Sequence, residues 1–520
     1  MKTYIKKYLL SLAVATGMTA GFSSCTDLDP TLYSNLTTAN AYSTEADINA
    51  ALVGAYADLA PYPGDAWLYY GGYFVMITDY ATDMGYSTAA GDPTKLSNMT
   101  YDSNNRYFRL CWQNMYQVIT NVNVILENVD NVDMTEANKT LVKAQAKFLR
   151  ALAYRDLTDA FGPVPLLTEL VDPSGAKDMP LTSVEQIDEF VAADLKECIN
   201  QLPEKWEGAD LARATKGAAA TLLGKMYMRS HDYQNAKTYI DMVLALRDQG
   251  VYRLNPDFKN VWSESNKHDM GSIFCILHEA TSNGGEITNH FGPSDHPDVP
   301  NRWQYYGVSL PFWRKYDKED PRREFYYYNY TGVSNRDDKS DYGFYYMMPD
   351  KGQTVPPNDT TKLLVNVATK KYSYEMVSDS YYDGRTISIF RLSDVILCKA
   401  EIENNLSGPN AALPYLNEIR ERAGAPLYGQ HERFPVPASK EAMNQAILDE
   451  RGFELAFEFQ RRPDLIRFGK YEETVNAYLK ELGLASPTNV TSDLRYFPYP
   501  LDDAQLNVNM ASANPSRQPK

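Results

Sequence analysis

Residues 221–244, TLLGKMYMRSHDYQNAKTYIDMVL, contain two closely spaced helical segments, and their pattern leaves few folds open to the chain. Small residues stand where two helices would cross, Gly224 in the first segment and Ala236 in the second. The large apolar residues around them are Leu223, Tyr227 and Ile240. This spacing predicts a helical hairpin in which Gly224 and Ala236 allow close approach and Tyr227 fills the turn.

The order Leu-Gly-x2-Tyr, with Ala nine residues later, is typical of tetratricopeptide repeats. Residues 147–157 and 395–419 resemble degenerate copies of it. A single repeat cannot bury its own faces, so we expect at least three stacked helix pairs. Helical periodicity elsewhere predicts further helices. The predicted helices are residues 45–60, 107–129, 135–162, 184–200, 213–230, 233–248, 390–405, 409–422 and 440–460.

Two segments lack this periodicity, residues 62–87 and 250–390, and both are rich in Tyr, Asn, Asp, Gly and Pro. Dense aromatic residues argue against disorder, so we expect ordered loops. The fold class predicted is mostly α: a tetratricopeptide-like helical solenoid packed against an irregular, aromatic-rich loop cap. The predicted boundaries are one domain over 25–520, with a helical scaffold at 40–250 and 390–485 and a cap at 62–105 and 250–390.

The first residues of the sequence predict a targeting signal. Lys2, Lys6 and Lys7 precede an apolar stretch at 8–22 that is short for a membrane span. Small residues then lead to Cys25, which resembles the lipidation site of bacterial lipoproteins. We therefore expect residues 1–24 to be a lipoprotein signal peptide and Cys25 to be lipidated, with ordinary cleavage nearby as the alternative.

The composition and the motifs of the chain exclude several classes of partner and of catalytic site. The formal net charge is −16, which disfavours nucleic acid and anionic membrane surfaces as partners. Phosphate-binding, serine-hydrolase and zinc-protease motifs are missing from the sequence. The four cysteines after Cys25 are far apart and stand mostly in apolar runs, so buried single thiols are expected rather than disulfides or a metal site. No cofactor and no metal are expected.

An acidic run, ILDERGFELAFEFQRRPDLIRFGK at 447–470, places Glu450, Glu454 and Glu458 four residues apart. On a continuous helix this spacing stacks three carboxylates on one face. The arginines available to them are Arg420, Arg422, Arg451, Arg461, Arg462 and Arg467. Nearby arginines neutralise carboxylates, whereas a general acid needs a raised pKa. We therefore interpret the run as an ion-pair lattice that joins helices rather than as a pair of catalytic acids.

Several of these stretches together resemble the SusD/RagB family of outer-membrane nutrient-binding lipoproteins over nearly the whole chain. The stretches that carry the resemblance, besides Cys25 and residues 447–470, are KFLRALAYRDLTDAFGPVPLL (147–167), FRLSDVILCKAEIENN (390–405), LNEIRERAGAP (416–426) and YFPYPLDDAQLNVN (496–509). The Gly-Tyr pair that often ends the family pattern is missing after Asn514 and Pro515.

The resemblance implies a lipid-anchored protein on the outer face of the outer membrane that acts as a lid on a SusC-like TonB-dependent barrel transporter. Its cargo would be an oligosaccharide, bound without catalysis and passed inward. The alternatives are a peptide-binding, RagB-like uptake lipoprotein and, further off, a secreted α-helical glycoside hydrolase or lyase. Contact with the membrane would be through the lipid anchor only.

The cargo site is expected in the aromatic segments, because sugars stack on aromatic rings and offer hydroxyls to polar side chains. The residues predicted to bind the glycan are Trp67, Tyr70, Tyr73, Asp83, Asn289, Trp303, Tyr305 and Tyr306. Trp67 and Trp303 are the two best candidates. The binding loops vary within the family, so no residue is assigned by motif.

Overall fold

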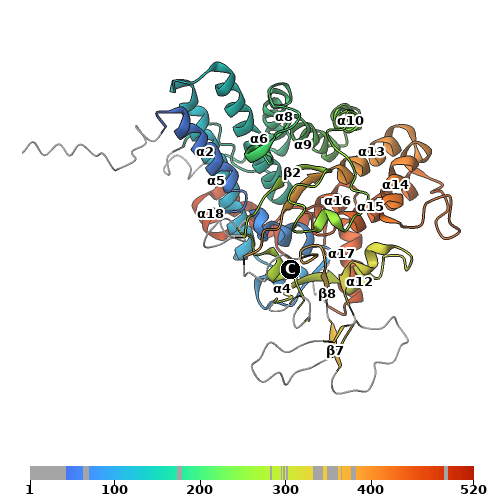
Figure 1. The fold of residues 1–520 in the computed structure, drawn as a ribbon. Coiled ribbons are helices and arrows are strands. Elements are labelled where there is room, and N and C mark those ends of the chain that lie inside the picture. Colours follow the sequence, from blue (N-terminus) through green and yellow to red (C-terminus); the bar gives the residue numbers. More distant parts are fainter. Residues whose placement is uncertain are drawn as a thin grey trace, which may run out of the picture. The chain divides into compact units, whose positions relative to one another are not determined.

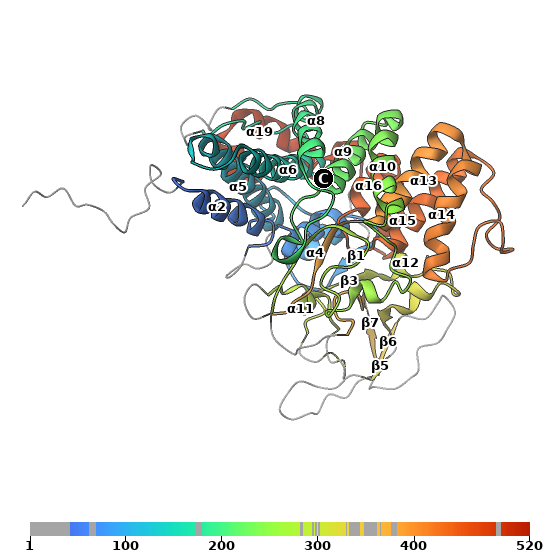
Figure 2. The ribbon, with the colours of Figure 1, turned by 45° about the horizontal axis from the view of Figure 1, so that its top comes forward.

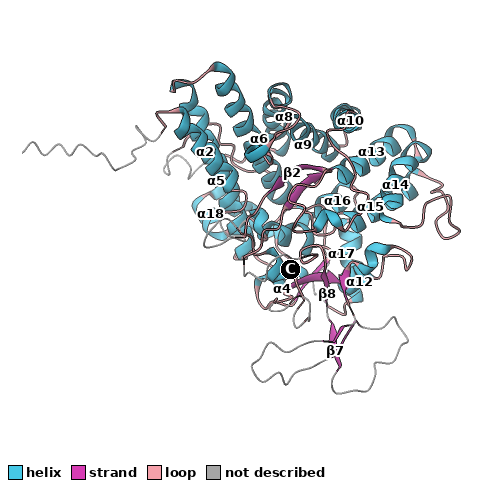
Figure 3. Ribbon diagram, viewed as in Figure 1, coloured by secondary structure: helices cyan, strands magenta, loops and turns pink. Residues whose placement is uncertain are grey.

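The structure, a computed structural model, describes residues 42–61, 69–171, 179–280, 284–293, 296, 299, 302–328, 330–331, 344–347, 361–364, 366–375, 382–484 and 490–519. Helices dominate these residues, and short strands lie between the helical segments of the sequence (Figure 3). The prediction of a mostly α fold is confirmed. None of the helices in these ranges combines the length and the apolar character that crossing a bilayer requires.

Local capping explains where several of the long helices begin. Thr44, Ser183 and Ser439 accept backbone N–H groups in the first turns of the helices that follow them. Such caps satisfy N–H groups that have no partner within the helix. The longer helices are α2 (Glu45–Ala57), α5 (Arg106–Asn128), α6 (Glu136–Phe161), α8 (Val184–Gln201), α9 (Lys216–Arg229), α10 (Tyr233–Asp248), α13 (Leu392–Ser407), α14 (Pro409–Ala423), α15 (Lys440–Glu454) and α17 (Tyr471–Glu481).

Successive helices pack against one another from α5 through α6, α8, α9, α10, α13 and α14 (Figures 1 and 2). The α9–α10 hairpin forms as its spacing predicts: a Cβ on Gly224 would lie 3.0 Å from the side chain of Ile240. Tyr227 stacks on Tyr239 with ring centroids 5.7 Å apart. The tetratricopeptide interpretation of the whole succession stays a prediction.

The cap contains short helices and small sheets where the sequence indicated only irregular loops. One sheet has the order β1 (Gly85–Ser87), β3 (Tyr306–Ser309), β8 (Asn366–Thr369) and β4 (Tyr326–Tyr327), with antiparallel neighbours. Its register pairs Gly85 with Val308 and Val308 with Val367, so three distant segments meet in it. The other sheets are β2 (Ser272–Ile276) with β9 (Ile387–Arg391), and β5 (Tyr330–Thr331) with β6 (Phe344–Met347) and β7 (Thr361–Leu364).

Short helical elements complete the cap and the C-terminal part. They include η1 (Tyr69–Gly71), α3 (Tyr73–Val75), η2 (Met76–Tyr80), α4 (Asp92–Ser97), η5 (Asn260–Trp262), α11 (Ile287–Phe291), α12 (Leu310–Trp313), η6 (Pro321–Glu324), α16 (Arg461–Arg467), η7 (Ser492–Arg495), α18 (Leu501–Leu506), α19 (Val508–Ala513) and η8 (Asn514–Arg517). Strand β9 runs directly into α13, so it connects the cap to the helical scaffold.

Helix α15 is shorter than the sequence predicted. The predicted helix 440–460 ends at Glu454, and Glu458 lies in the following turn, so the three carboxylates do not share one helix. Phe457 and Phe459 in that turn have left-handed backbone angles, φ 61° and 65°. The predicted signal peptide, Cys25 and Trp67 lie outside the described residues, and the domain boundaries stay predictions.

Candidate functional site

Trp303 and Tyr305 form an aromatic surface on the cap. Tyr305 is 41% exposed, Trp303 is partly exposed, and their ring centroids lie 5.5 Å apart with a tilt of 33°. Backbone hydrogen bonds fix this segment: Trp303 N–H donates to the Asn289 carbonyl at 2.9 Å, and Thr88 N–H donates to the Tyr305 carbonyl at 3.1 Å. The two rings are therefore presented by anchored backbone, as stacking against a ligand requires.

Buried rings support this surface from beneath. The His290 ring contacts Trp303 edge-on at 5.0 Å and stacks on Tyr306 at 4.7 Å. Burial lowers the pKa of His290 to about 3, so the imidazole is neutral and packs as an apolar ring. The Tyr306 hydroxyl lies 3.0 Å from that of Tyr107 on α5, which ties the aromatic surface to the helical scaffold.

A second aromatic feature, which we call the tyrosine pocket, adjoins the first. It has a volume of about 480 Å³. Its lining residues are His296, Glu324, Tyr326, Tyr327, Tyr328, Tyr330 and Lys370. The His296 ring lies 4.6 Å from Tyr327 and 4.7 Å from Tyr330. The Tyr330 hydroxyl donates to Gln304 Oε1 at 3.3 Å, and Gln304 stands between Trp303 and Tyr305. The tyrosine pocket and the Trp303–Tyr305 surface are thus neighbours.

Sequence reasoning did not select the tyrosine pocket. The run EFYYYNY at 324–330 did show a local excess of tyrosine, which was the available signal. Alternation in a strand puts neighbouring tyrosines on opposite faces, so composition alone could not tell which rings line a pocket and which join the core. In the structure Tyr326 is 3% exposed, whereas Tyr327 and Tyr328 are partly exposed.

Five of the other sequence-predicted residues are buried. Tyr70, Tyr73, Asp83, Asn289 and Tyr306 are each 4% exposed or less. The Tyr70 hydroxyl donates to Asp156 Oδ2 at 2.5 Å, and Arg302 Nη1 donates to Asn289 Oδ1 at 2.8 Å. Their burial and their hydrogen bonds within the protein favour a structural role over direct contact with a ligand on the surface. Trp303 and Tyr305 remain candidates for ligand contact, and Trp67, which lies outside the described residues, stays a prediction.

Asp83 illustrates this structural role. It pairs with Arg461 at 2.8 Å and with Lys315 at 2.7 Å. Burial alone would raise the pKa of Asp83, but Arg461 and Lys315 hold it below its usual range. The carboxylate is therefore ionised, and it joins the loop after η2 to the segment after α12 and to α16.

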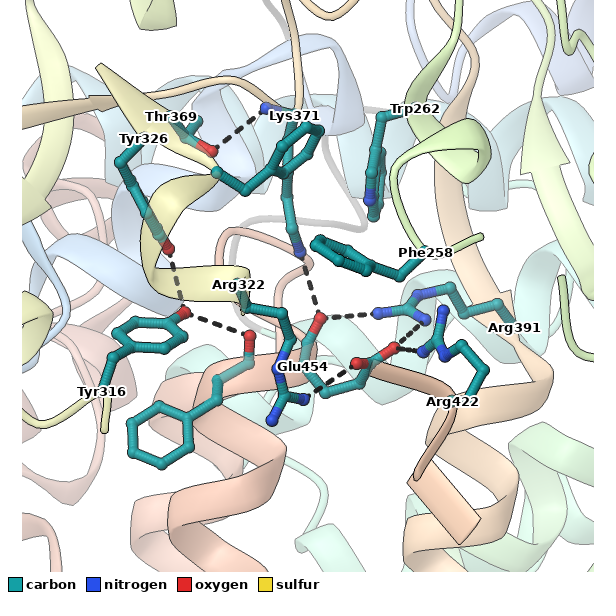
Figure 4. A pocket seen from close by; sticks show the side chains of 12 residues that line it. Phe258, Trp262, Tyr316, Arg322, Tyr326, Thr369, Lys371, Arg391, Arg422 and Glu454 are labelled. Atoms are coloured by element: carbon teal, nitrogen blue, oxygen red, sulfur yellow. Dashed lines mark hydrogen bonds and ion pairs between the residues drawn. The ribbon is translucent and has the colours of Figure 1, made fainter. Parts of the chain in front are cut away.

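The carboxylates Glu450, Glu454 and Glu458 form an ion-pair cluster, as the sequence predicted. Figure 4 shows Glu454 with its arginine partners. Glu454 forms ion pairs with the guanidinium groups of Arg322 at 3.1 Å, of Arg391 at 2.6 Å, and of Arg422. Glu450 pairs with Arg322 and with Arg420 at 2.8 Å, and Glu458 pairs with Arg391 and with Lys371 at 2.6 Å. Of these partners, the sequence identified Arg420 and Arg422.

The cluster does not resemble a hydrolytic site. Burial by itself would raise the pKa of Glu454, but Arg422, Arg391 and Arg322 hold it well below its usual range. A general acid needs the opposite shift, and a retaining glycosidase needs two carboxyls on either side of an open sugar site. No grouping of metal-ligating side chains occurs among the residues that the structure describes.

Comparison with known proteins identifies the fold and the family. Residues 224–515 match the model of the SusD family, and residues 28–228 match a model described as starch-binding associating with outer membrane. The chain belongs to the SusD family. The resemblance inferred from its motifs is confirmed.

Relatives of this SusD-family protein align over most of their length. SusD-like protein P2 of Formosa agariphila is 26% identical over 98% of this chain and 100% of its own. SusD-like protein P25 of the same organism is 28% identical over 76% of each chain. The starch-binding protein SusD of Bacteroides thetaiotaomicron is 23% identical, again over 76% of each chain.

Solved structures share the fold. A SusD homolog from Bacteroides thetaiotaomicron superposes with a TM-score of 0.74 at 22% identity, covering 91% of this chain and 97% of that one. A laminarin-binding SusD-like protein gives 0.68 at 24% identity, covering 90% and 98%. Surface glycan-binding protein A from Bacteroides thetaiotaomicron, in complex with laminarihexaose, gives 0.69 at 22% identity, covering 89% and 98%.

Proposed function

We propose that this SusD-family protein binds oligosaccharides at the Trp303–Tyr305 surface and the adjoining tyrosine pocket, does not cleave them, and delivers them to a SusC-like TonB-dependent transporter. The observation that carries the proposal is that the exposed Tyr305 ring and the partly exposed Trp303 ring lie side by side on anchored backbone, next to a tyrosine-lined pocket. Relatives described as starch-binding or laminarin-binding support the same class of ligand.

The chemistry of the two surfaces suits a sugar chain. The axial C–H groups of a pyranose pack on aromatic faces, and its hydroxyls need both donors and acceptors. The tyrosine pocket supplies rings together with phenol hydroxyls, the Glu324 carboxylate and the Lys370 ammonium. A stacked ring contributes roughly 0.5–1.5 kcal/mol beyond the burial of its area. A few such contacts give affinities in the millimolar to micromolar range, about −4 to −8 kcal/mol.

The proposal that binding occurs without catalysis rests on the state of the carboxylates. Glu450, Glu454 and Glu458 are each paired with cations and buried, so they are not poised to transfer protons to a sugar. A reducing-end assay on polysaccharides tests this directly. Robust turnover would replace the capture proposal with a glycoside hydrolase or lyase.

The proposed location is the outer face of the outer membrane, with an acyl anchor on Cys25. The family model described as associating with outer membrane supports this. Each buried methylene of an acyl chain contributes about 0.8 kcal/mol, so more than one chain gives a stable anchor. Metabolic labelling with a fatty-acid probe, compared between the wild type and Cys25→Ala, checks the lipid directly.

The binding test is calorimetric titration of a panel of β-glucan and α-glucan oligosaccharides against wild type and Trp303→Ala. We expect Trp303→Ala to weaken binding by about tenfold, because roughly 1.4 kcal/mol corresponds to that factor. Trp206→Ala is the matched control: Trp206 is also partly exposed, but it lies between α8 and α9 and donates to the Ala214 carbonyl. The proposal fails if the panel does not bind or if Trp303→Ala binds as the wild type does. Binding of a peptide digest alone would favour the peptide-uptake alternative.

A further inference from the structure

A small cavity of about 20 Å³ lies within the Glu–Arg cluster (Figure 4). Four cationic side chains line it, Arg322, Lys371, Arg391 and Arg422, together with the carboxylate of Glu454. Thr369 and six aromatic residues form the rest of its wall. A cavity needs roughly 10–15 Å³ to hold one water molecule, so this one admits a single water or an ion of similar size.

The charges around the cavity do not balance. Within the described part of the chain, the connected ion pairs join five cations, Arg322, Lys371, Arg391, Arg420 and Arg422, to four carboxylates, Asp320, Glu450, Glu454 and Glu458. Each of these side chains is at most 8% exposed. An uncompensated charge in such surroundings is strongly unfavourable.

No further carboxylate forms an ion pair with these five cations in the ranges that the structure describes, and the buried Asp79 carboxyl near Glu458, whose pKa burial raises to about 7, is protonated below that pH. The adjacent ion pairs join Arg451, Arg467 and Lys225 to Asp394, Asp464 and Glu401, which balance one another. Burial lowers the pKa of the Lys371 ammonium by more than its pairing with Glu458 raises it, so this buried ammonium is only partly compensated by its partner.

Arg422 also has a hydrogen-bond donor to spare. Its Nη2 donates to Glu454 and, at 3.1 Å, to Ser393 Oγ. Its Nε–H is buried and has no acceptor within the described part of the chain. Arg422 lines the cavity and is 6% exposed, so an acceptor inside the cavity is the available way to satisfy this group.

We propose that this cavity binds one small monovalent anion of the size of chloride. Such an ion fits the volume, compensates the excess charge and accepts from a guanidinium, whereas a water molecule satisfies only the hydrogen bond. Sulfate and phosphate exceed the volume. The ion would join α14 and α15 of the scaffold to η6 and β9 of the cap, which makes it a structural ion of the junction that supports the proposed glycan site.

The first test locates the ion. Crystals of the protein soaked in sodium bromide are measured above the bromine absorption edge. We expect an anomalous peak in the cavity lined by Arg322, Arg391 and Arg422. Density for a water molecule without anomalous signal would overturn the proposal.

The second test measures occupancy in solution. The thermal unfolding midpoint is recorded as sodium chloride replaces sodium gluconate at constant ionic strength, because a ligand that binds only the folded state raises the midpoint with its concentration. We expect a saturable rise for the wild type and for Arg433→Gln, a half-exposed arginine with carboxylate partners of its own. We expect no rise for Arg422→Gln, which balances the cluster and removes the spare donor.

These outcomes are separable from the proposed function, because none of them uses a glycan. A chloride response that Arg422→Gln retains would overturn the anion site. A bromide peak without any chloride response in the wild type would mean binding at crystal concentration only, and would also overturn it. If Arg422→Gln does not fold, the wild-type bromide map and chloride titration decide alone.

Discussion

Single charged residues determine how the cap is attached to the scaffold. Glu454 lies at the end of α15 and meets Arg322 of η6, Arg391 of β9 and Arg422 of α14 (Figure 4). A buried carboxylate with three guanidinium partners stabilises the fold only while all partners remain, because each cation left alone is buried without compensation.

We therefore predict that Glu454→Gln lowers the free energy of unfolding by about 3–5 kcal/mol. The matched control is Glu319→Gln, which removes a surface carboxylate that pairs with Arg433 and is 61% exposed. Its cost is expected to be about 1 kcal/mol or less. Urea denaturation followed by circular dichroism compares the two. Equal effects would show that the buried cluster contributes no more than a surface pair.

Asp79 is a buried carboxyl whose pKa is raised, whereas that of Glu454 is lowered. It is fully buried in η2, and burial raises its pKa to about 7, although the Thr78 hydroxyl donates to it at 2.7 Å. The Glu458 carboxylate adds to the increase. Because the folded pKa exceeds the unfolded value near 3.9, the folded state binds the proton more tightly, and its stability falls as pH rises from about 4 to about 7.

The expected result for Asp79→Asn is a gain in stability at pH 8 and little change at pH 4, since the amide imitates the protonated carboxyl. Each pH unit between the two pKa values is worth about 1.4 kcal/mol, so the gain is a few kcal/mol. Thermal unfolding of both proteins between pH 4 and pH 8 measures it. A pH profile that is unchanged by the substitution would contradict the assignment.

The sequence predicts the positions of the helices well, but it predicts their ends only in part. Apolar periodicity predicts α5, α6, α9 and α10 well, but the four-residue spacing of the glutamates wrongly extends α15 to residue 460. The rings of Phe457 and Phe459 account for the difference. Phe457 packs on Tyr80 and Phe291, and Phe459 packs on Tyr70 and Phe74, and this burial outweighs the cost of a left-handed backbone.

Helix α14 ends at a glycine with a left-handed backbone conformation. Gly424 ends α14 with φ 74°, and a Cβ there would lie 3.3 Å from Pro321. We predict that Gly424→Ala destabilises the protein by about 1–2 kcal/mol, because an alanine disfavours this conformation. Gly54→Ala in α2 should stabilise it by about 0.5–1 kcal/mol, since nothing lies within 4 Å of the added Cβ. Chemical denaturation measures the free energy of unfolding of both variants. Changes of the same sign for Gly424→Ala and Gly54→Ala would contradict this prediction.

For the whole molecule, sequence and structure agree on a helical scaffold with an aromatic cap, and they differ inside the cap. The sheet of β1, β3, β8 and β4 joins residues more than 200 positions apart, such as Gly85 and Val308, and local periodicity carries no information on such pairing. The same limit applies to the candidate site. The sequence indicated which segments are aromatic, but the exposure of Tyr305 and the burial of Tyr306 depend on that sheet.

Buried ion pairs lie both within the scaffold and between the scaffold and the cap, so we expect the two parts to unfold together in acid. Arginine and lysine partners hold the pKa values of Glu454, Asp394, Asp83 and Asp464 below their usual range against the effect of burial. Their stabilisation is therefore complete above the unfolded pKa values near 4 and is lost as pH falls below them. We expect near-UV circular dichroism, which reports the aromatic cap, and far-UV circular dichroism, which reports the helices, to change together below pH 4. Two separate transitions would show that the cap unfolds on its own.

Cys111, Cys198, Cys275 and Cys398 are free and buried, as their apolar surroundings predicted. Burial raises the pKa of the Cys275 thiol to about 11 and that of Cys398 to about 12, so neither forms the reactive thiolate near neutral pH. In a chain begun after Cys25, one cysteine introduced beside Trp303 would therefore react selectively with a maleimide dye. Fluorescence from that position would report cargo arriving at and leaving the cap in real time.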